Sequence, residues 1–197
     1  MKPINILNRR LILILILLFL MISNVKADDY RLFSGGIGIR VGFINSGTIT
    51  LTSRISGEKI GEYETTPKMS YGIFFDIPAR GSVGMFLGIN IHEISYESFQ
   101  NKVLNVEIGL KRLIYNNQGE LAFRPGISIG YAYVSEIAAI QKANLLTVTF
   151  LGEAVFLTNS KYGILLDLSI IYSPYGRDKR YEISTSPTFI FRSGVIF

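Results

Sequence analysis

The sequence predicts an all-β fold, an antiparallel up-and-down transmembrane β-barrel of eight strands that follows a cleavable signal peptide. Three observations predict it. An apolar segment near the N-terminus has the layout of an export signal. Beyond that segment, apolar residues recur at every second position in eight stretches, and the connections between the stretches alternate between short and long. No later segment of useful length has the 3.6-residue period of an amphipathic helix.

Residues 1–27 are predicted to be a signal peptide. Basic residues up to Arg10 precede an unbroken apolar run over 11–22, and Ala27 ends the short segment that follows. Export machinery recognises this arrangement of a positive region, an apolar core and small residues before the cleavage point. The apolar run is shorter than the roughly 20 residues that a membrane-spanning helix needs, which disfavours the alternative of an uncleaved anchor. We therefore expect residues 28–197 to form the mature barrel domain.

The predicted leader also explains the basic balance of the chain. The chain has 20 Lys and Arg residues against 15 Asp and Glu residues, but four of the basic ones lie in 1–27, so 16 would remain against 15 after cleavage. A nearly neutral mature domain gives no reason to expect a nucleic acid partner. Because the chain has no cysteine, disulfides and a lipid-modified N-terminal cysteine are excluded.

Eight stretches of the mature domain have the two-residue alternation of strands with one apolar face. In one of them, Met85, Leu87 and Ile89 alternate with Gly84, Phe86 and Gly88. The expected strands cover 36–43, 70–77, 83–92, 104–111, 121–133, 146–156, 162–172 and 188–197. Pro125 is an irregularity within the fifth strand, because proline cannot donate a backbone hydrogen bond.

The connections predict how the strands are arranged. Tight turns rich in Pro, Asn and Gly are expected at 78–81, 116–119 and 158–161, and longer polar loops at 45–68, 94–102, 135–144 and 173–186. Short turns at one end and long loops at the other are typical of bacterial outer-membrane barrels. Within the first loop, residues 48–52 also alternate. We interpret them as a hairpin that extends beyond the membrane, with a ten-stranded barrel as the alternative.

The volume of the side chains indicates which face points outward. An eight-stranded barrel has an interior only just wide enough to be filled by side chains. The apolar face carries about five large residues per strand, whereas the opposite face is rich in Gly, Ser, Ala and Thr. The bulky face is therefore expected to contact lipid, with aromatic residues such as Tyr71 and Phe123 near the strand ends in two interfacial girdles.

The same alternation places eight charged residues in the lumen, four of each sign. They are Arg40, Asp76, Glu107, Lys111, Arg124, Glu153, Asp167 and Arg192. Since a buried charge must be paired, we expect an ion-pair network that closes the lumen. The expected neighbours are Arg40 with Asp76, Arg124 with both Glu107 and Glu153, and Arg192 with Asp167. A gated ion path is the alternative role for these residues.

The C-terminal strand gives the most specific resemblance. Residues 189–197 read Phe-Ile-Phe-Arg-Ser-Gly-Val-Ile-Phe, and together with the leader and the eight strands they resemble the small outer-membrane barrels of the OmpX type and the OmpA membrane domain. The resemblance implies location in the outer membrane of a Gram-negative cell, contact with outer-membrane lipid and lipopolysaccharide, and recognition by the barrel-assembly machinery. By resemblance the assembly signal consists of Phe189, Phe191, Val195 and Phe197. Ser193 departs from the alternation, and the resemblance implies no single activity.

The single histidine bears on enzymatic function. One histidine and no cysteine exclude clusters of these metal ligands, and no motif indicates a cofactor. His92 lies near Ser95 and Glu97, the residue types of an outer-membrane lipid hydrolase. Lipid A deacylases have serine two residues after the histidine, where this chain has Ile94, and the alternation turns His92 toward the lumen. We therefore expect no enzymatic activity, with a lipid-modifying enzyme as the least favoured alternative.

The long loops are the remaining candidates for function. The loop 45–68 mixes charged residues with Ile and Tyr, and it could offer a strand edge to a surface ligand. The sequence thus favours a structural or surface-interaction barrel whose loops make contact with the host or the envelope. A narrow, porin-like channel is the alternative.

Overall fold

The computed structural model describes residues 36–77, 82–96, 99–115, 121–134, 142–157, 162–178 and 180–197. The predicted signal peptide and the three predicted tight turns lie outside these residues. In the described part of the chain, no helix is long and apolar enough to cross a bilayer.

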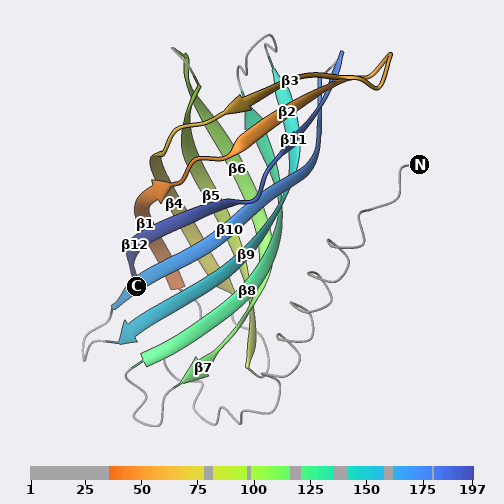
Figure 1. Ribbon diagram of the computed structural model, residues 1–197. Helices are drawn as coiled ribbons and strands as arrows, with labels where there is room; N and C mark the ends of the chain where they lie inside the picture. The colour runs from red at the N-terminus through yellow and green to blue at the C-terminus, as the bar shows by residue number, and fades with distance from the viewer. Residues whose placement is uncertain are drawn as a thin grey trace.

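Eight long strands form a closed antiparallel wall (Figure 1). They are β1 (Gly36–Ile44), β4 (Lys68–Ile77), β5 (Val83–Tyr96), β6 (Phe99–Arg112), β8 (Leu121–Val134), β9 (Ala143–Leu157), β10 (Gly163–Arg177) and β12 (Thr188–Ile196). Each pairs with its sequence neighbours, and β12 pairs with both β10 and β1, which closes the barrel. The prediction of an eight-stranded up-and-down barrel is confirmed.

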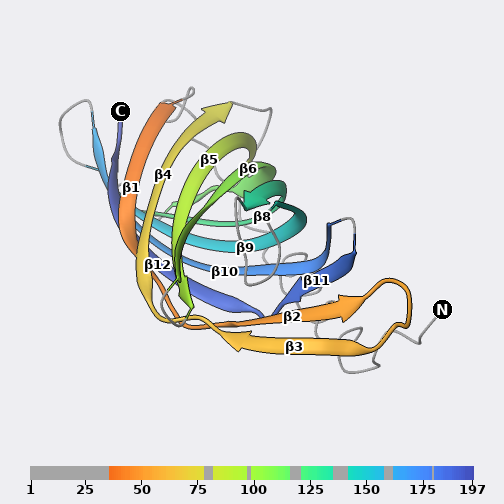
Figure 2. The same cartoon turned by 90° about the horizontal axis from the view of Figure 1, so that it is seen from above.

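Three short strands extend one end of the wall, which we call the hairpin end. They are β2 (Thr48–Ser53), β3 (Lys59–Glu64) and β11 (Tyr181–Thr185). β11 pairs with β10 and β2, and β2 pairs with β3, so the order at this end is β10, β11, β2, β3 (Figure 2). The ten-stranded alternative is wrong, because β1 pairs directly with β4 along its whole length and leaves no place in the wall for two more strands.

Parts of the predicted long loops are strand instead. β5 and β6 stay paired up to Tyr96 and Phe99, β9 begins at Ala143, and β10 continues to Arg177. These extensions are not apparent from alternation, because outward positions such as Lys102 and Asn144 are polar there. Polar outward side chains indicate that this part of the wall lies beyond the lipid, where the apolar alternation is no longer required.

The bulky face points outward, as expected from its volume. Ile39 is 49% exposed and Phe191 is 55% exposed, whereas the inward Arg192 is 1% exposed. Aromatic side chains near both ends of the wall, including Tyr71 and Phe123, are also exposed. The inner face is less uniformly small than expected, because several large apolar side chains fill the two ends of the lumen. They include Phe74, Phe86, Leu145, Leu151, Leu165 and Ile190.

Pro125 marks a local gap in the wall. β6 pairs with β8 as far as Lys111 and Gly126, and pairing resumes in β7 (Ile114–Tyr115) opposite Phe123. The register is the same on both sides of the gap. Since proline has no N–H to donate, the ladder is interrupted opposite Pro125 without a shift of the strands.

Candidate functional site

The barrel wall places all eight predicted lumen charges inside. Seven of their side chains are at most 5% exposed, and that of Asp76 is 12% exposed. They come from β1, β4, β6, β8, β9, β10 and β12, so nearly the whole circumference contributes. The cross-section of the lumen is therefore occupied by charged groups of both signs rather than by one sign.

Arg40 lies at the centre of this network. Its guanidinium contacts Glu107 and Asp167 at 2.9 Å each and Glu153 at 3.4 Å, and its Nη2 donates to Asn90 Oδ1 at 2.9 Å. These partners lie on β5, β6, β9 and β10, on both sides of β1 around the wall. One side chain thus bridges opposite parts of the lumen.

Arg192 completes the part of the network nearer the hairpin end. Its Nη2 lies 2.6 Å from Asp167 Oδ2, its Nε donates to the same oxygen at 2.8 Å, and its Nη1 donates to Asn90 Oδ1 at 2.9 Å. Asp167 therefore serves both Arg40 and Arg192, which are 3% and 1% exposed. Two positive groups share this one carboxylate.

The other part of the network lies toward the strand ends opposite the hairpin end. Arg124 contacts Glu153 at 2.6 Å and also pairs with Asp76. Lys111 lies 2.9 Å from Glu153 and 3.2 Å from Asp76. Glu153 therefore connects this group to Arg40.

Some pairs differ from the neighbouring-strand expectation. Arg192 lies beside Asp167 and Arg124 beside Glu153, but Arg40 contacts carboxylates on β6, β9 and β10 rather than Asp76 on the adjacent β4. In the β1–β4 register Arg40 faces Gly72, and Asp76 is four residues further along the strand. At about 3.3 Å per residue that offset is too large for a direct contact, whereas a long arginine side chain reaches across a narrow lumen.

The network also includes groups that the sequence reasoning did not single out. Asn90 donates to Glu107 at 2.8 Å, Ser128 donates to Glu107 at 2.7 Å, and Ser169 donates to Asp167. Buried carboxylates need such donors for their remaining lone pairs. The sequence does contain a signal for these three residues, because alternation places all of them on the inner face of the barrel.

Two inward phenylalanine rings contact cationic groups of the network. The Lys111 ammonium lies 4.2 Å from the ring centroids of both Phe74 and Phe86, and the Arg40 guanidinium lies 5.3 Å from that of Phe74. Both rings are 0% exposed. A ring face attracts a cation, so these side chains combine filling of the lumen with electrostatic stabilisation.

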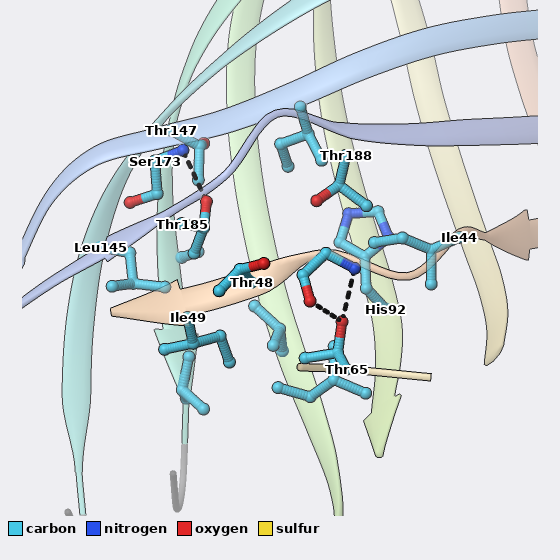
Figure 3. A pocket seen from close by; sticks show the side chains of 16 residues that line it. Ile44, Thr48, Ile49, Thr65, His92, Leu145, Thr147, Ser173, Thr185 and Thr188 are labelled. Atoms are coloured by element: carbon cyan, nitrogen blue, oxygen red, sulfur yellow. Dashed lines mark hydrogen bonds between the residues drawn. The ribbon is translucent and has the colours of Figure 1, made fainter. Parts of the chain in front are cut away.

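A cavity lies between the network and the hairpin end (Figure 3). Its volume is about 70 Å³, and it is partly open. His92 contributes to its lining two residues along β5 from Asn90, together with apolar side chains that include Ile49, Ala132 and Leu145. His92 is 2% exposed, and its Nδ1 lies 3.0 Å from Ser70 Oγ.

The contact between His92 and Ser70 does not form a hydrolytic site. Nε2 of His92 has no hydrogen-bond partner among the described residues, so no carboxylate orients the ring. Ser70 is 0% exposed, so its hydroxyl is closed to a substrate. Ser95 is buried and Glu93 is half-buried, whereas Glu97 lies outside the described residues.

The predicted assembly signal lies on the outer face of β12 and just beyond its end. Phe189, Phe191 and Phe197 are 52%, 55% and 64% exposed. The backbone of Phe197 is paired to β1, since its N–H donates to Ile37 O at 2.9 Å and its carbonyl accepts from Ile37 N at 3.3 Å. Ser193 is also outward, opposite Val41.

Comparison with known proteins supports the fold. No family model matches the chain, and no curated protein matches it. The crystal structure of Neisserial surface protein A superposes with a TM-score of 0.53 at 9% identity, over 81% of this chain and 95% of that one. The outer membrane protein OprG of Pseudomonas aeruginosa superposes with the same TM-score at 11% identity, over 83% and 96%.

This chain has the fold of the small eight-stranded outer-membrane barrels. Both similar structures are covered almost completely, so the likeness concerns the whole barrel and not one hairpin. At 9% and 11% identity it extends to the fold and no further. What a barrel of this fold does depends on its lumen and on its hairpin end.

Proposed function

We propose that the protein is an outer-membrane barrel with a shut lumen whose hairpin end binds a partner at the cell surface. The proposal includes export by the leader 1–27, so that the mature chain begins at Asp28. The exposed apolar belt supports insertion in a membrane, since such a surface is incompatible with water over so large an area. The ion-pair network supports a closed lumen.

The single observation that carries the surface role is the free edge of β3. Among the described residues, β3 is the last strand of the sheet at the hairpin end and pairs only with β2 (Figure 2). An edge strand presents N–H and C=O groups to which a strand of another protein can pair. The long hairpin thus supplies a docking edge outside the membrane.

Backbone contacts next to β3 identify which amides face that edge. Thr65 N donates to Gly47 O at 2.8 Å on the β2 side, and Thr66 N donates to Ser95 O at 2.9 Å on the opposite side. Because amides alternate in direction along a strand, those of Glu62 and Glu64 point the same way as that of Thr66. Beyond the Thr66 bridge, β3 has no strand on this side in the described part of the chain.

The side chains near the edge indicate what kind of partner fits. Ile60 is 54% exposed and Ile55 at the tip is 95% exposed, while Lys59 and Glu62 pair with each other. Charged residues on an edge discourage pairing with arbitrary strands. We infer that the partner is an extended segment that offers apolar side chains to the isoleucines and a basic residue to Glu64.

Two proline variants test this role. Glu62→Pro removes an amide on the free edge, whereas Tyr63→Pro removes one on the β2 side and serves as the matched control. Gram-negative cells that display each variant are compared for binding to immobilised extracellular-matrix proteins and to cultured epithelial cells. Wild-type cells should bind, Glu62→Pro cells should lose most of that binding, and Glu62→Gln cells should keep it.

Two results would contradict the surface role. Either display of the wild-type barrel adds no binding, or Glu62→Pro binds as well as wild type. Surface levels of every variant are measured with an antibody so that loss of display is not mistaken for loss of binding. The narrow channel is the alternative, and its test is the conductance measurement described in the Discussion.

A further inference from the structure

The cavity beside His92 is suited to bind a molecule, independently of the surface role. We propose that it binds a small uncharged amphiphile, an apolar chain with a hydroxyl head, whose head hydrogen-bonds to His92 Nε2. The residues that line the cavity lie on β1, β2, β5, β6, β8, β9, β10, β11 and β12 and on the segments next to β2 and β3, so the site is part of the folded barrel (Figure 3).

The unpartnered nitrogen of His92 is the first observation. His92 is 2% exposed, Nδ1 is engaged by Ser70 Oγ at 3.0 Å, and Nε2 has no partner among the described residues. A buried polar atom without a hydrogen bond costs about 1–3 kcal/mol. A ligand that supplies this bond recovers that cost on binding.

Most of the other polar side chains of the lining are already hydrogen-bonded. Thr65 Oγ1 exchanges hydrogen bonds with Gly47, Ser173 Oγ donates to Leu146 O, and Thr147 Oγ1 donates to Asn105 Oδ1. Thr185 Oγ1 accepts from Ser173 N, as Figure 3 shows. Among the described residues, His92 Nε2 is therefore the one fully buried side-chain polar atom of the lining without a hydrogen bond.

The walls indicate the chemical class of the ligand. Ile49, Ala132, Val134 and Leu145 are all 5% exposed or less and line the cavity, and no described lining residue is acidic, lysine or arginine. The nearby Arg40 and Arg192 are already paired with carboxylates. A charged head would enter without a counter-charge, so an uncharged one is favoured.

The head group must suit either tautomer of the imidazole. If Ser70 donates to Nδ1, Nε2 carries a proton and donates; if Nδ1 donates to Ser70, Nε2 accepts. A hydroxyl can do both. The volume of about 70 Å³ holds the head and its first carbons, and because the cavity is partly open, the rest of the chain can extend out of it.

The experiment uses the fact that His92 is the only histidine in the sequence. The barrel, with a tag free of histidine and with ¹⁵N-labelled histidine, is placed in phosphatidylcholine nanodiscs. It is titrated with 1-hexanol, and the imidazole ¹⁵N signals are followed. Wild type should show a saturable shift at Nε2. Filling the cavity with Ala132→Leu should abolish that shift, while Ala154→Leu on the outer face should preserve it.

A further measurement separates the contribution of the head group from that of the apolar chain. n-Heptane replaces the hydroxyl with a methyl group and should bind about three- to tenfold more weakly than 1-hexanol, as expected for the loss of one hydrogen bond. If Ala132→Leu fails to fold, Thr48→Leu fills the cavity from β2 instead. Folding of each variant is checked by heat-modifiable mobility on gels.

Three outcomes would overturn the proposal. They are the absence of a saturable shift, which means that only water occupies the cavity, an unchanged shift in both cavity-filling variants, and equal binding of n-heptane and 1-hexanol. None of these bears on the β3 edge, because the cavity variants leave Glu62 and Glu64 untouched.

Discussion

Arg40 and Asp167 form a buried ion pair with 2.9 Å between Nη1 and Oδ2, although 127 residues separate them in the chain. β12 lies between their strands in the wall, so the pair spans the seam at which the barrel closes. Asp167 also holds Arg192, which is on β12 itself. The last strand is therefore joined to the first by side chains inside the lumen as well as by backbone pairing.

Removing the charge of Asp167 should strongly destabilise the barrel. Asp167→Asn leaves Arg192 without its ion-pair partner, and breaking a buried pair in this way costs about 3–5 kcal/mol. Urea unfolding in lipid vesicles, followed by circular dichroism, measures the change. Glu62→Gln, an exposed carboxylate outside the lumen, is the control and should change stability by less than about 1 kcal/mol. Equal effects of the two substitutions would show that the buried pair has no special role.

The network should block ion flow. Wild-type protein in planar bilayers is expected to show no steady, large openings. The double variant Asp167→Ala with Arg192→Ala removes one balanced pair, so it widens the lumen without adding net charge, and it should give small, frequent openings. Large steady openings of the wild type would contradict the shut lumen and favour the porin-like channel.

The sequence predicted the wall and the composition of the lumen, but not all of the pairing inside it. Alternation determines on which face Arg40 lies, because side chains along a strand point to opposite faces in turn. It does not determine how far a long side chain reaches. Arg40 contacts three carboxylates on more distant strands rather than Asp76 on the adjacent strand. Contacts across a barrel depend on the stagger of all strands together, which no single segment encodes.

The cavity could not be predicted from the sequence for a related reason. Alternation places His92 in the lumen, but part of the cavity beside it is lined by β2 and β11, which fold against the end of the wall. The sequence predicts these segments as a hairpin within 45–68 and as part of the loop 173–186, without their positions relative to the wall. Their pairing buries Ile49 and Ile183, and this packing forms one side of the hairpin end.

The seam between β1 and β12 should tolerate no side chain at Gly194. A Cβ there would meet the backbone carbonyl oxygen of Ile39 and the Cα of Arg40, which cannot move without opening the ladder. Gly194→Ala should therefore cost about 1–3 kcal/mol through overpacking, or prevent closure. Thermal unfolding followed by heat-modifiable mobility measures it. Gly84→Ala is the matched control. Because the nearest heavy atom to a Cβ at this position is 3.6 Å away, this substitution should leave stability nearly unchanged.

The terminal phenylalanine is predicted to act in assembly rather than in stability. Its backbone is already paired with Ile37, and its side chain is 64% exposed, so Phe197→Ala should leave the unfolding free energy of the refolded barrel almost unchanged. In cells, the same variant should accumulate far less in the outer membrane, because the proposed recognition by the assembly machinery requires the terminal aromatic ring. Fractionation of membranes, with immunodetection of folded protein, compares the two.

Phe156→Ala is the control for that experiment. Phe156 is also aromatic and outward-facing, is 44% exposed, and lies on β9 near the same end of the barrel, but it is not at the terminus. A general loss of aromatic contact with lipid would lower the outer-membrane levels of both variants equally. A specific assembly signal would lower only that of Phe197→Ala, and equal accumulation of this variant and wild type would contradict the role.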